Sequence, residues 1–198
     1  MKITAIKQQQ KRADRYSVFV DDTYSFSLSE SALIESRLHS GQELTPAELA
    51  DLKKTAGLDK AYGNTLRYVA IRPRSEGELH DYFRRKQIDQ AAGSQIIERL
   101  RKVGLVDDSA FAKAWVDNRR LLKNVSKRRL QMELRQKRVP TEIINQVLQD
   151  DESDDRQVLR QLVEKKRARY PDNQKLMQYL ARQGFSYDDI KFALSGSE

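Results

Sequence analysis

The first part of the chain alternates hydrophobic and polar positions with a period of two. Three segments, residues 2–6, 15–20 and 24–28, place apolar side chains at every second position, and polar turns separate them. Such alternation is typical of strands that bury one face. We predict a small antiparallel sheet, which would be only marginally stable alone and should therefore pack on the helices that follow.

The hydrophobic period changes to that of a helix after these strands. Ser29 is a good helix cap, and Thr45 precedes a proline that suits the first position of a helix. From about Asp59 onward we find only helical spacing, with apolar residues three and four positions apart. The chain is therefore predicted to be mainly α-helical.

The helical part repeats itself three times. In each repeat a polar cap precedes two apolar positions four residues apart, and another apolar residue follows the helix. A helix on either side completes a unit of three helices. The aligned apolar pairs are Leu79 with Phe83, Leu130 with Leu134, and Leu176 with Leu180.

These patterns predict a mainly α fold in which three tandem three-helix repeats form an elongated, curved array, preceded by a small antiparallel β segment with short helices. The β segment with its short helices should occupy residues 1–58. The three repeats should occupy residues 59–106, 107–150 and 151–198. Arrays of this kind commonly present binding surfaces.

The net charge of +8 is concentrated in the middle of the chain. Residues 59–106 carry 10 basic and 6 acidic side chains, and residues 107–150 also carry 10 and 6, so each segment contributes an excess of four. The flanking segments are balanced. A basic region between neutral ones indicates a polyanionic partner, usually nucleic acid. A surface of Lys and Arg that is merely solvated is the alternative.

The basic residues that could meet a polyanion gather at the ends of predicted helices. Arg84, Arg85 and Lys86 lie at one carboxyl-terminal end, and Arg135, Lys137 and Arg138 lie at another; there they also complement the helix dipole, which is an alternative explanation for them. Lys127, Arg128 and Arg129 instead lie at an amino-terminal end, where the dipole disfavours cations, so we expect phosphate contact there. No base-reading motif accompanies them, so binding should tolerate any DNA sequence and weaken with salt. The candidate DNA- or filament-binding residues are Arg72, Arg74, Arg84, Arg85, Lys86, Arg119, Arg120, Lys127, Arg128, Arg129, Arg135, Lys137 and Arg138.

The sequence contains no recognisable catalytic, cofactor or metal site. There is no cysteine, His39 and His80 are far apart, and no phosphate-binding loop motif is present. No apolar run approaches the ~20 residues needed to cross a bilayer, and the amino terminus lacks the core of a signal peptide. We expect a non-enzymatic protein of the cytoplasm, where the absence of disulfides is usual.

Three conspicuous features have simple structural explanations. Asp107 and Asp108 precede an apolar helical series and should cap a helix. Trp115 lies four residues after Phe111 and should pack in the core rather than stack on a base. The acidic run at residues 150–155 lacks the spacing of a calcium loop, so it should link two units and cap the following helix.

Four motifs together resemble the RecX family of bacterial regulators of the RecA recombinase. They are R-x-R-S-x-x-E-L at residues 72–79, G-L-V-D-D-x-x-F-A-x-x-W at 104–115, L-x-x-E-L-x-x-K at 130–137 and G-F-S at 184–186. The first two together are quite specific. The resemblance covers about residues 59–195, and the leading strands resemble the amino-terminal extension of some members.

The resemblance implies a protein that binds RecA filaments on single- or double-stranded DNA and lowers strand exchange, ATP hydrolysis and co-protease activity. It thereby implies a part in DNA repair, recombination and the SOS response. The basic residues above would contact DNA or RecA, the binding form would be a monomer, and no cofactor would take part. Two alternatives stay open, a helix-turn-helix transcriptional regulator and a protein-interaction scaffold whose charge only keeps it solvated.

The chain departs from the family pattern at certain glycine positions. The glycine common after the second helix of a unit is replaced by Gln87 and Arg138, and it remains only as Gly184. A glycine expected before the second unit's middle helix is missing near Asn124. These departures leave the local geometry of the helix ends open.

Overall fold

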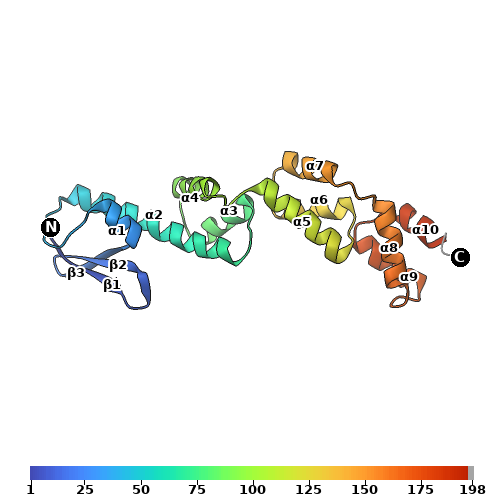
Figure 1. The fold of residues 1–198 in the computed structure, drawn as a ribbon, viewed down its shortest axis with the longest axis horizontal. Helices are drawn as coiled ribbons and strands as arrows, with labels where there is room; N and C mark the ends of the chain where they lie inside the picture. Colours follow the sequence, from blue (N-terminus) through green and yellow to red (C-terminus); the bar gives the residue numbers. More distant parts are fainter. Residues whose placement is uncertain (196–198) are drawn as a thin grey trace. The chain divides into compact units, whose positions relative to one another are not determined.

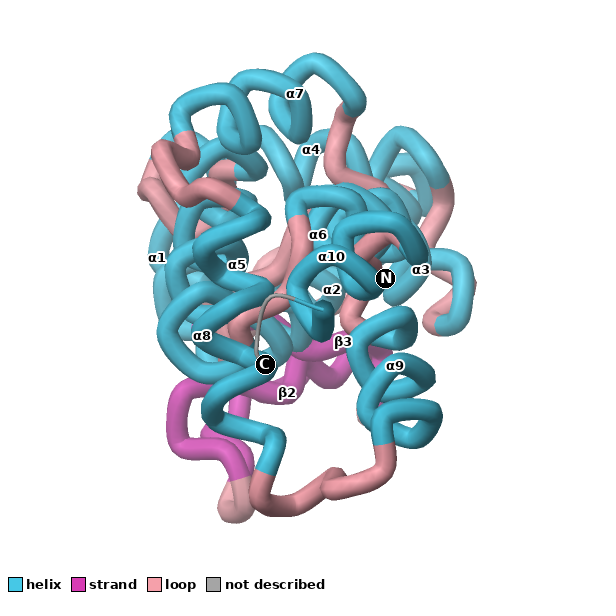
Figure 2. Tube along the Cα trace, turned by 90° about the vertical axis from the view of Figure 1, so that its right-hand side faces the viewer, coloured by secondary structure: helices cyan, strands magenta, loops and turns pink. Residues whose placement is uncertain are grey.

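The protein is described by a computed structural model over residues 1–195. These residues form two compact parts, one containing Met1–Pro73 and Phe83–Leu105, the other Arg74–Tyr82 and residues 106–195. The described chain has three strands followed by ten helices (Figure 1). All strands lie in one small sheet, and every later element is helical (Figure 2). The prediction of a mainly α fold is confirmed.

The amino-terminal sheet is the predicted meander. Its strands pair antiparallel in chain order. Ile3, Val18 and Leu28 are fully buried in the core beneath it, so the alternating positions do point to one buried face. The strands are β1 (Ile3–Gln9), β2 (Arg12–Val20) and β3 (Thr23–Ser29).

Both predicted caps begin helices after the sheet. Ser29 Oγ accepts from the N–H of Ala32 at the start of α1 (Glu30–Ser36). Thr45 forms a reciprocal capping box with Glu48 at the start of α2 (Pro46–Ile71). Helix α2 runs without interruption past residues 58 and 59, so the predicted division there falls inside a continuous helix and not in a loop.

The first three-helix unit consists of the end of α2, α3 (Glu76–Arg85) and α4 (Gln90–Lys102). Helix α4 packs on α2. Gly93 permits the ring of Phe83 to approach α4 closely, because a Cβ at that position would lie 2.9 Å from the ring. Residues of α3 up to Tyr82 belong to the second compact part, and those from Phe83 onward belong to the first.

The second and third units each enclose a separate hydrophobic core. The core of the second unit is built around Leu130, Leu134 and Ile144, and that of the third around Leu176 and Leu180. The second unit contains α5 (Asp108–Lys123), α6 (Lys127–Gln136) and α7 (Thr141–Asp150), and the third contains α8 (Asp155–Arg167), α9 (Asn173–Arg182) and α10 (Tyr187–Ser195). All six aligned apolar positions predicted for the middle helices are buried.

The glycine substitutions do not change the course of the chain. Gln87 and Arg138 both follow a middle helix with φ of +55°, in the same left-handed region as Gly184 at +94°. Asn124, before the second middle helix, has φ of +49°. The left-handed turn is therefore kept by side chains that favour it less than glycine, at about 1–2 kcal/mol each.

Within residues 1–195, no group of His, Cys, Asp and Glu side chains is placed to hold a metal ion. Over the same range, no helix combines the length and the apolar character needed to cross a membrane.

Candidate functional site

Middle helices of successive units meet through a repeated polar contact, which we call a joint. At the first joint, Ser75 Oγ donates to the main-chain carbonyl of Lys137 at 2.5 Å and accepts from the N–H of Glu78. The N–H of Glu76 donates to Asp108 Oδ1 at 2.9 Å. The amino end of α3, which would otherwise expose unsatisfied N–H groups, is therefore held by residues of the next unit.

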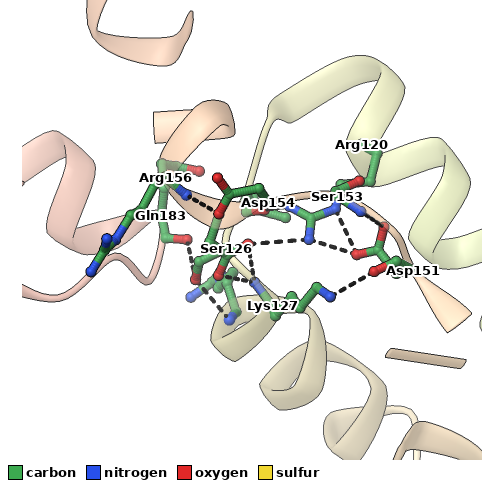
Figure 3. A network of polar contacts seen from close by, with 11 residues as sticks. Arg120, Ser126, Lys127, Asp151, Ser153, Asp154, Arg156 and Gln183 are labelled. Atoms are coloured by element: carbon green, nitrogen blue, oxygen red, sulfur yellow. Dashed lines mark hydrogen bonds and ion pairs between the residues drawn. The ribbon is translucent and has the colours of Figure 1, made fainter. Parts of the chain in front are cut away.

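The second joint repeats these contacts (Figure 3). Ser126 Oγ donates to the carbonyl of Gln183 at 3.2 Å and accepts from the N–H of Arg129 at 3.1 Å. The N–H of Lys127 donates to Asp155 Oδ2 at 2.9 Å. The same three roles, filled by a serine, a carbonyl and an aspartate, therefore recur in the next unit.

A related contact ties the amino-terminal sheet to α2. The N–H of Ser29 donates to Asp59 Oδ2 at 2.9 Å, and the Ser29 hydroxyl donates to Asp59 Oδ1 at 2.5 Å. The buried Arg15 also pairs with Asp59, at 3.0 Å. A serine at the start of a helix again meets an aspartate supplied by the following unit.

Ion pairs close the first joint. Lys137 Nζ lies 2.8 Å from Glu78 Oε1, and Arg138 Nη1 lies 3.1 Å from Asp81 Oδ1. These lysine and arginine side chains were candidates for DNA contact. In the fold they neutralise acids of α3.

The second joint is held by Arg120 and an acidic linker (Figure 3). The Arg120 side chain is only 13% exposed, and its guanidinium lies 2.6 Å from Asp151 and 3.2 Å from Asp155. Lys127 Nζ donates to the carbonyl of Asp151 at 2.6 Å. Burial would raise the pKa of Asp151, but hydrogen bonds from Ser153 and Arg120 and the charge of Arg120 hold this pKa below its ordinary value.

The acidic run at 150–155 also has the capping role that its position predicts. Asp154 accepts from the N–H of Arg156 and caps α8 (Figure 3). Asp107 caps α5 in the same way, by accepting from the N–H groups of Ser109 and Ala110. Its neighbour Asp108 was also expected to cap, but its carboxylate reaches across to α3 at the first joint.

A buried glutamate organises the cations around Trp115. Glu133 Oε2 accepts from Trp115 Nε1 at 3.0 Å and from Arg119 Nε at 2.6 Å, and Oε1 accepts from Arg129 Nε at 3.1 Å. Burial would raise the pKa of Glu133, but these hydrogen bonds and the charge of Arg119 hold it below its ordinary value. Trp115 stacks on Phe111 and packs against the core of the second unit, as predicted.

Much of the predicted basic surface is therefore engaged within the fold. Lys127, which we expected to need a phosphate, has the Asp151 carbonyl as its partner. Arg128 and Arg135 are exposed, and no ion pair to either is found within residues 1–195. In the second unit, candidates with internal partners include Arg119, Arg120, Lys127, Arg129, Lys137 and Arg138.

The remaining candidates lie near α3. Arg84, Arg85 and Lys86 are exposed at the end of that helix. Arg72 and Arg74 are half-buried, and Arg72 donates to the carbonyl of Pro73. Arg74 belongs to the second compact part and the other four to the first.

A groove beside the second joint brings the candidates Arg128 and Arg129 together with Lys123, Lys165, Lys166 and Arg182, which the sequence did not single out. One hollow of about 750 Å³ is lined by Lys123, Arg128, Arg129 and Arg182 among others. A neighbouring hollow of about 290 Å³ shares Lys123, Tyr179 and Gln183 with it and adds Lys165 and Lys166. We call the two together the basic groove. The third unit's contribution was hidden because residues 151–198 have no net charge as a whole.

Models of one protein family match the chain in four consecutive segments. The regulatory protein RecX N-terminal domain matches residues 1–45. The first, second and third three-helix domains of RecX match residues 61–100, 107–148 and 153–194. The matches therefore include the sheet and all three helical units.

Individual relatives agree with these matches. The chain is 30% identical over 200 residues to the regulatory protein RecX of Listeria monocytogenes serotype 4b (strain F2365), covering 98% of this chain and 74% of that protein. It is 34% identical over 171 residues to the regulatory protein RecX of Oceanobacillus iheyensis, covering 83% of this chain and 63% of that protein. It is 32% identical over 154 residues to the regulatory protein RecX of Listeria innocua, covering 78% of this chain and 57% of that protein. The matches thus span 57% to 74% of the relatives' lengths.

Solved structures share the fold as well as the sequence pattern. A crystal structure of regulatory protein RecX superposes with a TM-score of 0.74 at 26% identity and covers 98% of both chains. RecX from Lactobacillus salivarius gives a TM-score of 0.59 at 25% identity, covering 70% of this chain and 95% of that one. Sequence, domain order and fold agree, and the chain belongs to the RecX family of regulatory proteins.

Proposed function

We propose that this chain is a non-enzymatic regulator that binds RecA filaments on DNA and lowers their strand exchange, ATP hydrolysis and co-protease activity. It would thereby moderate DNA repair, recombination and the SOS response. Membership of a family of regulatory proteins supports the regulatory role. The observation that carries the DNA contact is the set of exposed cations on α6, Arg128 and Arg135, for which the fold supplies no ion pair within residues 1–195.

The proposed contact is electrostatic and independent of DNA sequence. Lysine and arginine side chains on exposed helix faces can follow phosphates, but they carry no base specificity without further groups that read base edges. Binding should therefore weaken steeply with salt, because each phosphate contact releases counterions. The divisions at residues 59–106, 107–150 and 151–198 are proposed as three modules of one monomeric binding scaffold, each joined to the next through the serine and aspartate contacts.

The principal test adds the purified protein to RecA filaments preformed on single-stranded DNA. ATP turnover and strand exchange should fall at near-stoichiometric amounts of protein to RecA. An unchanged rate at such amounts would rule out the proposed role. Inhibition should be weaker at higher salt if phosphate contacts contribute.

A charge-reversed variant locates the contact. Arg128→Glu with Arg135→Glu should reduce inhibition several-fold, because two exposed cations become anions facing a polyanion. The matched control, Lys113→Glu with Arg160→Glu, makes the same charge change at exposed positions of α5 and α8. Equal loss in both variants would mean that net charge alone governs binding. DNA binding that random duplex fails to displace would point instead to a sequence-specific regulator.

A further inference from the structure

The second joint is open at the positions where ion pairs close the first. Aligning Ser75 with Ser126 places Met132 where the first joint has Asp81. Aligning Lys137 with Gln183 likewise places Gly184 where the first joint has Arg138. The 3.1 Å pair between Asp81 and Arg138 therefore has no counterpart at the second joint. Met132 is uncharged and Gly184 has no side chain, so neither partner of that ion pair is kept.

The other ion pair of the first joint is also lost. Lys137 and Glu78 lie 2.8 Å apart, whereas the aligned positions hold Gln183 and Arg129. Arg129 turns to Glu133 within its own helix. Met132, Gln183, Gly184 and Arg129 all line the larger hollow of the basic groove. The groove thus occupies the place that ion pairs fill at the first joint.

The groove collects positive charge without a matching negative charge. Lys123, Arg128, Lys165 and Arg182 are exposed, and no ion pair to any of them is found among residues 1–195. Among the described residues that line the groove, the one acid is Glu133, which Arg119 and Arg129 already neutralise. Cations crowded together in this way repel one another, and a bound anion would relieve that repulsion.

Apolar side chains lie among these cations. Leu122 is 64% exposed and Met132 is 45% exposed, and each lines one of the two hollows. Tyr179 lines both, with one face stacked on Tyr170 at 5.2 Å between ring centroids. In duplex nucleic acid the base faces are covered by stacking, whereas an unpaired strand offers them to apolar side chains next to its phosphates. A ligand with alternating phosphate and apolar groups fits this lining best.

We propose that the basic groove binds a segment of single-stranded nucleic acid, with phosphates on Lys123, Arg128 and Arg182 and with bases against Leu122 and Met132. The larger hollow, about 750 Å³, is of the size of small-molecule sites and holds a short segment of on the order of one or two nucleotides. This proposal rests on the proposed function in one respect, namely that a filament supplies such a strand. The binding itself requires no RecA.

The test measures binding of a fluorescein-labelled oligothymidylate to the full chain by fluorescence anisotropy, without RecA and over a series of salt concentrations. The groove variant carries Lys123→Gln, Arg128→Gln and Arg182→Gln. Its affinity should fall by at least about tenfold, and the slope of log K against log salt should become shallower by about one, because the contacts to one or two single-strand phosphates are lost.

Three further variants complete the test. The control Lys113→Gln, Arg160→Gln, Lys175→Gln removes the same charge from exposed positions outside the groove and should bind like wild type. Met132→Asp places in the groove an acid equivalent to Asp81 of the first joint, so it should weaken binding several-fold without removing any cation. A groove variant with lysine in place of Arg128 and Arg182 should largely retain binding, and circular dichroism checks that each variant is folded.

The outcomes separate the two proposals. Equal affinity of the groove variant and wild type, or equal loss in groove variant and control, overturns the groove assignment. Tighter binding of a duplex or of a polyglutamate peptide than of the oligothymidylate overturns the assignment to a single strand. If the groove variant loses oligonucleotide binding while wild-type protein leaves RecA filaments unaffected, the groove stands and the proposed regulatory function fails.

Discussion

The two joints share their main-chain contacts and differ in almost every charged side chain. In each, a serine hydroxyl donates to a carbonyl at the end of the next middle helix. The first N–H of the helix that the serine caps donates to an aspartate of the next unit. The first joint adds ion pairs between α3 and the end of α6. The second adds Arg120 against the acidic linker. The repeat therefore fixes where the helices meet, whereas the charges around that contact differ from one joint to the next.

Each joint also has one glycine at its closest approach, but on opposite sides. At the first joint a Cβ on Gly77 of α3 would lie 2.2 Å from the Cβ of Arg138. At the second, the position aligned with Gly77 is Arg128, and the glycine is Gly184, in the turn that follows α9. A Cβ there would lie 2.4 Å from Ser126 Oγ. The two segments can approach closely when only one of them has a glycine at the contact. At the second joint Gly184 fills that role, so the aligned position on α6 can carry the exposed Arg128.

The largest expected effect on stability comes from adding a side chain at Gly184. Gly184→Ala should lower the free energy of unfolding by about 3–5 kcal/mol, because the strain of a left-handed residue adds to overpacking against Ser126 and Arg129. Gly104→Ala is the matched control, since Gly104 also has positive φ but nothing within 4 Å of the added Cβ. It should lose only about 1–2 kcal/mol. Urea unfolding of both variants checks this, and equal losses would mean that strain alone acts at Gly184.

Removing Arg120 should break the second joint only. Arg120→Ala leaves the carboxylates of Asp151 and Asp155 without their cation, and loss of one partner of a buried pair costs about 3 kcal/mol. Urea unfolding measures the loss, and Arg138→Ala provides the comparison at the first joint. Arg138 is 54% exposed, so its loss should cost about 1 kcal/mol or less. A larger effect at Arg138 would reverse the ranking of the two joints.

The serine contacts should be similar at both joints. Ser75→Ala and Ser126→Ala each remove a helix cap and a hydrogen bond to a carbonyl, so each should cost about 1–2 kcal/mol. Thermal or urea unfolding of the two variants compares them directly. Ser109→Ala, at an exposed position of α5, should change little. A large gap between Ser75 and Ser126 would show that the shared main-chain geometry conceals unequal joints.

The smallest effect concerns acid sensitivity. The pKa of Asp151 in the folded state lies below the ordinary aspartate value of 3.8, so the unfolded chain binds the proton more readily. The stability that this group contributes is therefore complete above the unfolded pKa and is lost as the pH falls through the folded pKa, below about pH 4. Asp151→Asn should be less stable near neutral pH and should lose less stability on acidification. Urea unfolding at several pH values tests this, and an unchanged acid slope would contradict it.

The repeated cores were predictable because their signal is local. Leu130 and Leu134, or Leu176 and Leu180, need only a spacing of four residues to mark a buried face. Caps such as Thr45 and Asp107 are equally local. The length of α2 was not predicted, because its first half packs on the sheet and its second half on α4, so no single stripe runs along it.

The joints could not be found from sequence. Ser75 and Lys137 are 62 residues apart, and the acceptor is a main-chain carbonyl, which leaves no mark on residue type. The same reason explains why Lys127 was assigned to phosphate, since its internal acceptor is the carbonyl of Asp151. The basic groove was missed because charge was counted by segment, whereas the groove draws on α5, α6, α8 and α9.

The order of the joint partners along the sequence affects how the chain folds during synthesis and how it responds to truncation. In each joint the serine is synthesised before the aspartate and carbonyl that it meets. The middle helix of a unit therefore leaves the ribosome capped by its own serine but with its first N–H group bound only to water, and that group gains its aspartate when the next unit emerges. A chain cut just before Asp155 would leave Lys127 and Ser126 in that unfinished state, so shortening from the carboxyl end weakens the unit that remains.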